Sequence, residues 1–499
     1  MQCDIRKHDV RQFEIKVSYP LDRDHRREQY RLEVFLFMPY QIGVNSQTYP
    51  REQFYDDLRN YTRFKTPPLT LDDLLDGSGS RSPLNRIAGM IEQGRSNGDW
   101  REARLVYELK LSAVLVRVNL RDACRRARDG LRRSETENAP SKTGHDLVES
   151  LDTLASALDR FRKLTDRLSE CDAPETVKRT ARLADEFASL QAEGILLWFL
   201  RDLEKRQVSP DVLRNLRDRI LRHVRGEQAH RKHSGYPSHV SREDDRNNEY
   251  FLHREGLLKK FCSSVLFLSV AERPGRRRVQ HTIYAIAAGL AMAVGVAGLW
   301  VASRYYERNT LAIGLVIVIL YMIRDRLKEV FRQIASQLLP RWTCDRRGRL
   351  EDRESDRKVG VTKEAFNWRN LKRVSSAILQ ARRYEDSLER EVAEPNESVM
   401  QYEKKVTINS GRIYETHERL AAVDDIFRIQ VGHWLHHMDD PRKTLLDIHD
   451  NDKLDAIKAR RVYHVNMVVR LQSDSRDIEQ VQRARLILSR RGIERLELP

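Results

Sequence analysis

Residues 282–303 read TIYAIAAGLAMAVGVAGLWVAS, a run of twenty-two residues without a single charge. A helix of this length is about 33 Å long, close to the thickness of the hydrocarbon core of a bilayer. Tyr284 and Trp300 lie near its two ends, where aromatic rings favour the headgroup region. We interpret the run as a transmembrane helix. The alternative is a buried core helix of a soluble protein, but few soluble helices lack charged residues over such a length.

A second apolar run follows after only six residues, at 310–323, with the sequence TLAIGLVIVILYMI. Its fourteen residues cover about 21 Å as a helix, short enough for a re-entrant or soluble core segment. Its many branched apolar residues, flanked by Arg308 and Arg324, favour a second span instead. The expected fold class is therefore an α+β membrane protein, predominantly helical, with a two-helix transmembrane hairpin.

Basic residues flank this pair of runs. Arg276, Arg277 and Arg278 precede the first run and Arg324 follows the second. By the positive-inside rule both chain ends should face the cytoplasm, and these four arginines should contact anionic lipid headgroups. The N-terminal sequence MQCDIRKHDVRQFEI lacks the apolar segment of a secretory signal, so the internal runs should bring the chain to the membrane. A bacterial inner membrane is the expected location.

The first run also carries a ridge of small residues at four-residue spacing. Such a ridge lets another helix approach closely. The partner could be the second run or the same ridge on another copy of the chain, and the sequence leaves both open. The ridge consists of Ala285, Gly289, Ala293 and Ala297.

Outside these runs the chain has soluble character. The mean hydropathy is −0.64, which excludes a polytopic channel or transporter, and 40% of the 499 residues are hydrophobic, which excludes a wholly disordered chain. The net charge of +16 favours an anionic partner, either nucleic acid or an acidic lipid surface. Five scattered cysteines with no C-x-x-C pair indicate a reducing compartment without a zinc or disulfide framework.

Residues 1–83 form an expected N-terminal α/β region. Apolar residues alternate from Phe13 to Tyr19 and again from Tyr30 to Met38, which predicts two strands paired as an antiparallel hairpin. A helix is expected after Pro50, and Thr70 begins a T-x-x-D capping box of another.

Residues 84–248 are expected to form a cytosolic helical bundle with polar linkers at 134–145 and 225–248. A self-associating coiled coil is the alternative, because the apolar residues from Leu147 to Leu168 follow a heptad-like spacing. Three heptads are few, so packing within one chain is preferred.

The rest of the chain divides into three expected parts. Residues 249–340 should be the membrane region, with flanking amphipathic helices, and residues 341–358 a charged linker, since eleven of the fourteen residues from Asp345 to Lys358 are charged. Residues 359–499 should be a small cytosolic α+β domain, with strands at 402–408 and 463–471, an amphipathic helix at 420–438 and a closing hairpin at Gly492.

His433 and His437 are one helical turn apart and could share a metal ion. The H-E-x-x-H glutamate is missing and no third ligand follows from the spacing, so surface histidines are the better interpretation. No phosphate loop, dinucleotide fingerprint or nucleophile elbow is present. No cofactor is expected and no catalytic residue can be named.

A row of arginines between Arg117 and Arg133 could track the phosphates of a nucleic acid. The row lacks interleaved aromatic residues, which argues against nucleic acid as the partner. The expected function is that of a membrane-tethered scaffold or sensor acting through a protein partner or as a homo-oligomer. The alternatives are a membrane-tethered enzyme with an unrecognised active site and a membrane-associated nucleic-acid-binding protein.

Overall fold

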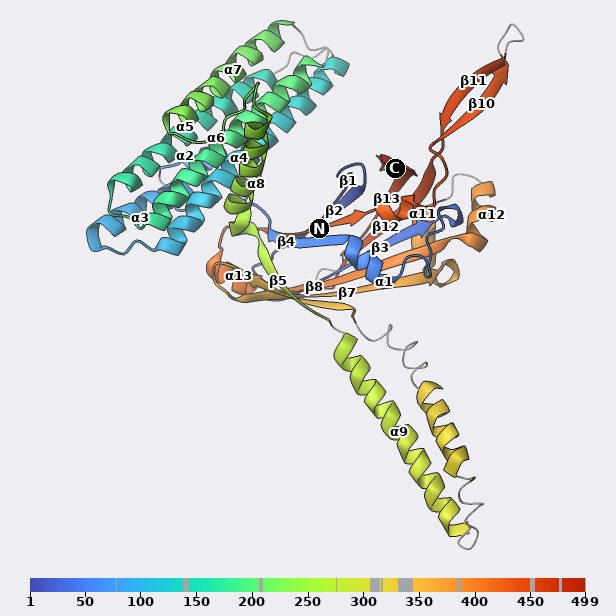
Figure 1. The fold of residues 1–499 in the computed structure, drawn as a ribbon. Coiled ribbons are helices and arrows are strands. Elements are labelled where there is room, and N and C mark those ends of the chain that lie inside the picture. The colour runs from blue at the N-terminus through green and yellow to red at the C-terminus, as the bar shows by residue number, and fades with distance from the viewer. Residues whose placement is uncertain are drawn as a thin grey trace.

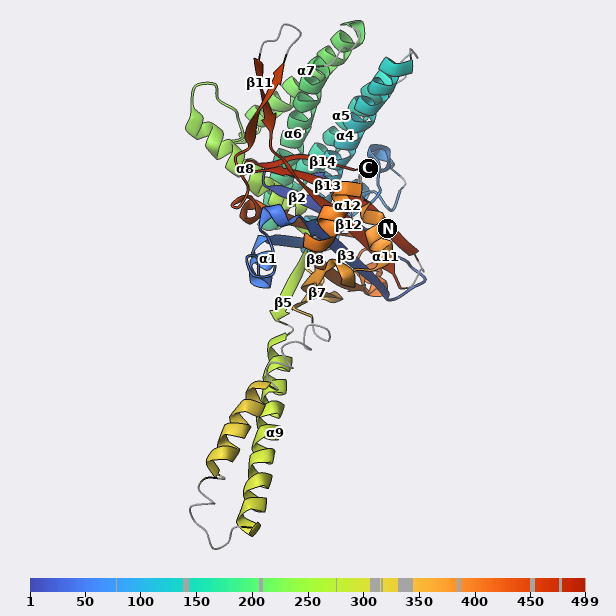
Figure 2. The ribbon, with the colours of Figure 1, turned by 90° about the vertical axis from the view of Figure 1, so that its right-hand side faces the viewer.

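Two antiparallel β-sheets stacked face to face form the centre of the molecule. A helical bundle stands on one side of them and a long apolar helix projects from the other (Figures 1 and 2). Both chain ends lie in the central sheets. The computed structural model describes residues 1–77, 79–137, 143–205, 210–274, 276–305, 315, 317–330, 344–383, 387–448, 454–474 and 478–498.

The larger sheet has eight strands in the order β14-β13-β12-β3-β8-β7-β6-β5, so one strand from the beginning of the chain lies among strands from its second half. Val34 of this N-terminal strand is level with Tyr402 on one side and with Val469 on the other. The strands are β3 (Glu28–Met38), β5 (Leu268–Pro274), β6 (Arg346–Asp352), β7 (Lys358–Asn370), β8 (Ser398–Ile408), β12 (Tyr463–Ser473), β13 (Ile478–Ser489) and β14 (Gly492–Glu497).

The smaller sheet has four strands in the order β1-β2-β9-β4, and it too combines the two ends of the chain. Ile15 is level with Ile5 on one side and Phe427 on the other. Its strands are β1 (Gln2–Lys7), β2 (Gln12–Pro20), β4 (Leu58–Phe64) and β9 (Ala422–Gln430).

The predicted pairing of the first two strands is therefore wrong, although both strands exist. β2 pairs with β1 and β9, whereas β3 pairs with β8 and β12, so the two belong to different sheets. Alternation shows that one face of each strand is buried but not which strand is its neighbour. The expected small C-terminal sheet is likewise wrong, because its strands share both sheets with the N-terminal ones.

Aromatic rings and one buried ion pair fill the space between the sheets. The rings of Tyr19 and Tyr30 stack with centroids 4.9 Å apart. Lys404 of β8 is fully buried, and its Nζ lies 2.8 Å from an Asp425 carboxylate oxygen of β9 and 3.4 Å from Glu364 of β7. The two sheets are thus joined by charge as well as by apolar packing.

Two further predictions for the C-terminal part are wrong. The helix expected at 420–438 is β9 followed by the 3₁₀ turn η4 (Gly432–Leu435). Residues on both faces of β9 are buried, including Asp424 and Asp425, so its sequence lacks the simple alternation by which a strand is recognised. The charged linker expected at 341–358 contains β6, which pairs with β5 and β7. Gly348, Leu350 and Asp352 are buried there, whereas Arg347 and Arg349 are exposed.

The helical bundle is built around one long helix that packs against its neighbours along most of its length. The predicted apolar stripe from Leu109 to Ala127 is buried in the bundle, and so is the heptad-like stripe from Leu147 to Leu168. Within the described residues both stripes are therefore covered by the chain itself. The helices are α2 (Leu71–Leu75), α3 (Pro83–Asn97), α4 (Glu102–Glu137), α5 (Thr143–Glu170), α6 (Glu175–Glu204), α7 (Pro210–His233) and α8 (Asp245–Ser263).

The boundaries of the bundle differ in part from those expected. The capping box at Thr70 is present at the start of α2. The linker predicted at 134–145 is helical at both ends, and residues 138–142 lie outside the described part. Helix α8, expected to lie against the membrane, packs on α4 and α6 instead, with Arg254 donating two hydrogen bonds of 2.6 Å to Glu186.

The expected two-helix transmembrane hairpin is overturned. Helices make up 52% and strands 29% of the structure, with large sheets rather than a predominantly helical membrane fold. Among the described residues one helix, α9 (Arg276–Tyr305), is long and apolar enough to cross a bilayer. The second predicted run lies partly outside the described residues. The helix described at 317–330 carries charged residues over its second half. Its apolar part is therefore too short to cross a bilayer.

The remaining elements decorate the sheets. A two-stranded hairpin, β10 and β11, projects beyond the larger sheet as a separate arm (Figure 1). A second small apolar cluster between α11 and the larger sheet includes Phe37 and Ile378. The elements are β10 (Arg442–Ile448), β11 (Leu454–Arg460), η1 (Tyr40–Ile42), α1 (Arg51–Asp57), η2 (Ser264–Leu266), η3 (Leu371–Arg373), α11 (Ser376–Arg382), α12 (Ser387–Asn396) and α13 (Ser410–Thr416).

Buried charges join the bundle to the sheets. Arg419 donates hydrogen bonds of 2.6 and 2.7 Å to the two carboxylate oxygens of Glu108 on α4, and both side chains are buried. Beside this pair, the buried His417 lies 3.0 Å from Asp352 of β6. Because such groups have no water to replace a lost partner, they fix how the bundle sits on the sheets.

We expect Glu108→Gln to lower the free energy of unfolding by about 3 to 5 kcal/mol, because it leaves the buried guanidinium of Arg419 without its carboxylate. Urea denaturation measures the change. The matched control is Glu415→Gln, which breaks an ion pair with Arg357 whose side chains are 58% and 61% exposed and should cost less than about 1 kcal/mol. Equal effects of the two substitutions would contradict the assigned role of Glu108.

Stability should also fall in acid through Asp352. Burial raises the pKa of this carboxyl, but hydrogen bonds involving His417 and Ser355 outweigh burial and lower the pKa from 3.8 to about 2. A carboxyl whose pKa is lower in the folded chain than in the unfolded chain stabilises the fold at any pH above the unfolded pKa. This contribution is lost as the pH falls from about 4 to about 2. The free energy of unfolding of the wild type should exceed that of Asp352→Asn by about 1 to 2 kcal/mol at pH 6. The difference should shrink as the pH falls from about 4 to about 2.

Candidate functional site

The apolar run at 282–303 forms most of α9, and its side chains are exposed. Only 6% of the window Tyr284–Val301 is buried, and its mean hydropathy is 1.9. A core helix of a soluble protein would be mostly covered. The large side chains exposed along α9 are Ile286, Leu290, Met292, Val294, Val296, Leu299, Trp300 and Val301.

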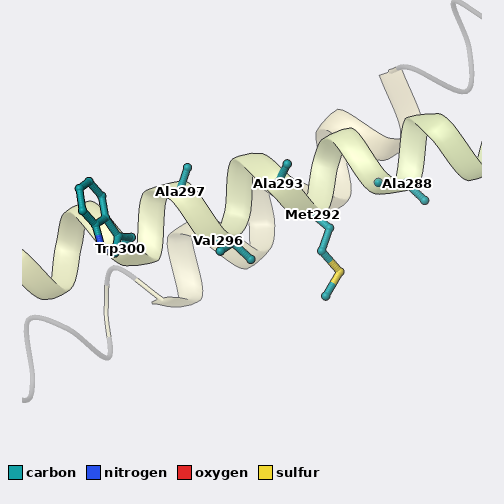
Figure 3. A pocket seen from close by; sticks show the side chains of 7 residues that line it. Ala288, Met292, Ala293, Val296, Ala297 and Trp300 are labelled. Atoms are coloured by element: carbon teal, nitrogen blue, oxygen red, sulfur yellow. The ribbon is translucent and has the colours of Figure 1, made fainter.

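The predicted ridge of small residues lies on an open side of α9. Its members Ala285, Gly289, Ala293 and Ala297 are exposed, and three of them line an open groove together with Ala288, Met292, Val296 and Trp300 (Figure 3). The helix at 317–330 contacts the opposite side. There Ala291 is buried, and a Cβ added to Gly298 would come within 2.4 Å of the Leu320 side chain. Ala291 is two residues from Ala293, about 200° around the helix.

The arginines predicted to contact lipid headgroups fall into two groups. Arg276, Arg277 and Arg278 form the first turn of α9. The Arg324 guanidinium lies 3.7 Å from the centroid of the Tyr321 ring and 3.4 Å from Asp325. The first group therefore lies at the start of the apolar helix α9, and Arg324 lies within the helix at 317–330.

The segment that contains α9 leaves the body and returns to it at one place. β5 ends at Pro274, two residues before α9, and Pro274 is level with Arg346 of β6. The two strands are antiparallel neighbours in the larger sheet. Both ends of the segment are therefore fixed to the same edge of the larger sheet.

The two candidate metal ligands do not converge. His433 lies on η4, where its Nδ1 is 3.0 Å from both carboxylate oxygens of the buried Asp57, and Tyr49 donates a hydrogen bond of 2.8 Å to the same carboxylate. His437 packs its Cβ toward Gly43. The described residues contain no group of three or more histidines, cysteines and carboxylates that could hold a metal ion. His433 thus acts as a partner of Asp57.

The arginine row of α4 has a setting that the sequence did not reveal. A groove of about 800 Å³ lies between α4, α6 and α8. One wall of it is lined by Arg121, Arg125 and Arg128. Exposed apolar side chains, among them Trp198 of α6 and Leu252 of α8, line the same groove. At the sheet end of α4, Arg117 continues the row toward β4.

Further cations come from the outer face of the smaller sheet. Strand register places Arg6, Glu14, Arg428 and Arg59 in one row across β1, β2, β9 and β4. Arg428 and Arg59 are far from Arg6 and Glu14 in the sequence, so only the strand order brings the four together. Charge alone marks them in the sequence, and it marks many other arginines equally.

The two groups of cations meet where the bundle joins the smaller sheet. Phe267, between α8 and β5, forms a backbone bridge with Arg63 of β4, and its ring centroid is 6.0 Å from that of Tyr61. This contact brings the end of α8, which carries Lys259, against the sheet face.

No protein-family model, curated protein or solved structure matches this chain.

Proposed function

We propose that this is a membrane-tethered binding protein, held to a bilayer by α9, with its bundle and sheets serving as a scaffold beside the membrane. The observation that carries the proposal is the 6% burial of an eighteen-residue apolar window. Soluble proteins rarely leave a contiguous apolar surface of this extent in water, since each Å² removed from water contributes about 25 cal/mol. Lipid is the natural covering for such a helix.

The pairing of β5 with β6 supports an arrangement with the whole body on one side of the membrane. Because Pro274 and Arg346 are neighbours in one sheet, the strands before and after α9 cannot be separated by a bilayer. Both chain ends lie in these same sheets (Figure 1). The arginines at the start of α9 favour the cytoplasmic side by the positive-inside rule.

A role in binding rests on the surfaces that the body presents away from α9. The β10–β11 arm exposes Leu446, Ile448 and Leu454, and Leu446 alone is 72% exposed. A two-stranded hairpin is marginally stable by itself in water, and unpaired strand edges invite pairing with another chain. The arm and the bundle both rise on the side of the sheets opposite α9 (Figures 1 and 2), where a partner in solution could reach them.

Flotation with liposomes tests the membrane tether. The full chain should rise with the vesicles, whereas Leu290→Lys combined with Val294→Lys should remain at the bottom of the gradient. Both side chains are exposed, so the substitutions leave the packed body unchanged. A lysine near the centre of a membrane helix costs about 2.5 to 3.5 kcal/mol, so two should reduce partitioning more than a thousandfold.

The control is Leu446→Lys, which makes the same chemical change at an exposed leucine on the β10–β11 arm and should float like the unmodified chain. Circular dichroism should show the same fold in all three proteins. Flotation of the double variant at the wild-type level, or a wild-type chain that stays in the aqueous fraction, would contradict the tether.

A further inference from the structure

We propose that the β10–β11 arm pairs edge to edge with the same arm of a second copy of this chain. The β10 strands of the two copies lie antiparallel across a twofold axis at Leu445, so that two hairpins form one four-stranded sheet. The inference names a partner for the binding surface proposed above. Pairing of the arms needs only the arm itself, whereas the orientation of the two copies relative to membranes rests on the proposed tether.

The outer edge of β10 is open. Among the described residues β10 pairs with β11 alone, and all seven residues of β10 are exposed. At the base of the arm the Arg461 N–H donates a hydrogen bond of 3.0 Å to the Pro441 carbonyl. Because backbone groups alternate in direction along a strand, Thr444 and Leu446 then direct theirs outward. Such an edge is a template for another strand, and a two-stranded hairpin by itself is marginally stable.

The charges on β10 are self-complementary. Lys443 and Asp447 stand two residues before and two residues after Leu445. With Leu445 facing its counterpart, Lys443 of each copy lies directly opposite Asp447 of the other, so the contact occurs twice. Opposite charges at facing positions stabilise antiparallel strands. Within the described residues neither side chain has an ion pair inside its own chain.

The hairpin also contains a like-charge contact that this pairing offsets. Asp447 of β10 faces Asp455 of β11 directly, and like charges at facing positions destabilise a sheet. In the paired arms Lys443 of the second copy lies on the free side of Asp447. A cation then stands beside the two carboxylates, which favours the paired state over the single arm.

The same register continues an apolar row across the sheet. Leu445 faces Ile457 within the hairpin, and these side chains are 47% and 49% exposed. Pairing at Leu445 places the two leucines side by side, with an isoleucine on either flank. The row then runs across all four strands on one face. Removal of this apolar surface from water adds to the attraction between the charges.

Other pairings of the arm lack this match. Moving the axis by one residue in either direction places Lys443 or Asp447 opposite Leu445 instead. Parallel pairing in register sets each charge beside the same charge of the other copy. The edge of β11 offers no antiparallel twofold register with opposite charges facing, because Asp455 and Lys458 lie on opposite faces of that strand.

Antiparallel pairing also fixes how the two copies point. The arm rises on the side of the sheets opposite α9 (Figures 1 and 2). A second arm that runs the other way therefore carries an α9 that points away from the first. Two copies held by facing bilayers satisfy this arrangement, whereas two copies in one bilayer do not. The paired arms then join two membrane surfaces.

Sedimentation of the detergent-solubilised full chain over a range of concentrations measures the pairing, and we expect a reversible dimer. Lys443→Asp should raise the dissociation constant about tenfold or more, because two attractive contacts in each dimer become repulsive. Adding Asp447→Lys to this variant restores opposite charges and should restore the dissociation constant of the unmodified chain. The matched control is Lys458→Asp, the same change on the outer strand β11, which should dimerise like the unmodified chain.

Cross-linking tests the position of the axis. Leu445 directs its backbone groups toward β11, so it meets its counterpart as a non-hydrogen-bonded pair with Cα atoms about 4.5 Å apart, a distance that a disulfide can bridge. Mild oxidation should therefore link Leu445→Cys into a covalent dimer. Ile457→Cys lies about 14 Å from its counterpart and should link no more than the unmodified chain, whose five cysteines set the background.

Vesicles test the orientation. The unmodified chain should cluster liposomes, measured as a rise in hydrodynamic radius, whereas Lys443→Asp should float with them without clustering them. A chain that is monomeric at every concentration, a charge exchange that fails to restore the dimer, or equal cross-linking at the two cysteine positions would overturn the pairing. A dimer that floats without clustering vesicles would overturn the facing arrangement. Absence of flotation contradicts the tether and the orientation, whereas the dimer is measured in detergent and is judged separately.

Discussion

The position of β3 inside the larger sheet is the constraint on which the rest of the structure depends. This N-terminal strand lies between β8 and β12, and its pairing partners follow it by more than 350 residues. The sheet therefore cannot close until the C-terminal part of the chain is present, and such non-local pairing is slow to form. Between β3 and β8 the chain leaves this sheet to form the bundle, returns to it at β5, leaves again at α9 and returns at β6.

The buried contact between Lys404 and Asp425 fixes the register in which the two sheets meet. Taking both charges out of water is costly, so the pair contributes little net stability compared with an apolar contact of the same shape. The ion pair does, however, strongly disfavour other strand registers. A one-residue slip of β8 that brings Glu403 into the core would turn Lys404 outward and leave Asp425 buried beside another carboxylate and without a cation. Charge here selects one arrangement among several that apolar packing alone would allow.

The sequence predicted where several helices and strands lie better than it predicted which strands pair with each other. The charge-free run became α9, alternation located β2, β3 and β12, and Gly492 adopts the positive φ expected for the closing hairpin. Strand order could not be read, because alternation reports burial of a face and says nothing of which distant strand supplies the cover. For the same reason the arginine row of α4 was visible in the sequence, whereas Arg428 and Arg59 become neighbours only through the register of β9 and β4.

The order of elements along the chain ties the helical bundle to the apolar helix. Phe267 follows α8 and bridges to Arg63 of β4, and β5 then leads to α9. The seven residues of β5 span about 23 Å, and hydrogen bonds to β6 hold them extended along the edge of the sheet. A strand of fixed length therefore separates the junction of the bundle and the smaller sheet from the start of α9. No flexible linker intervenes among the described residues from Phe267 to Pro274, so the body holds the start of α9 at a fixed distance from this junction.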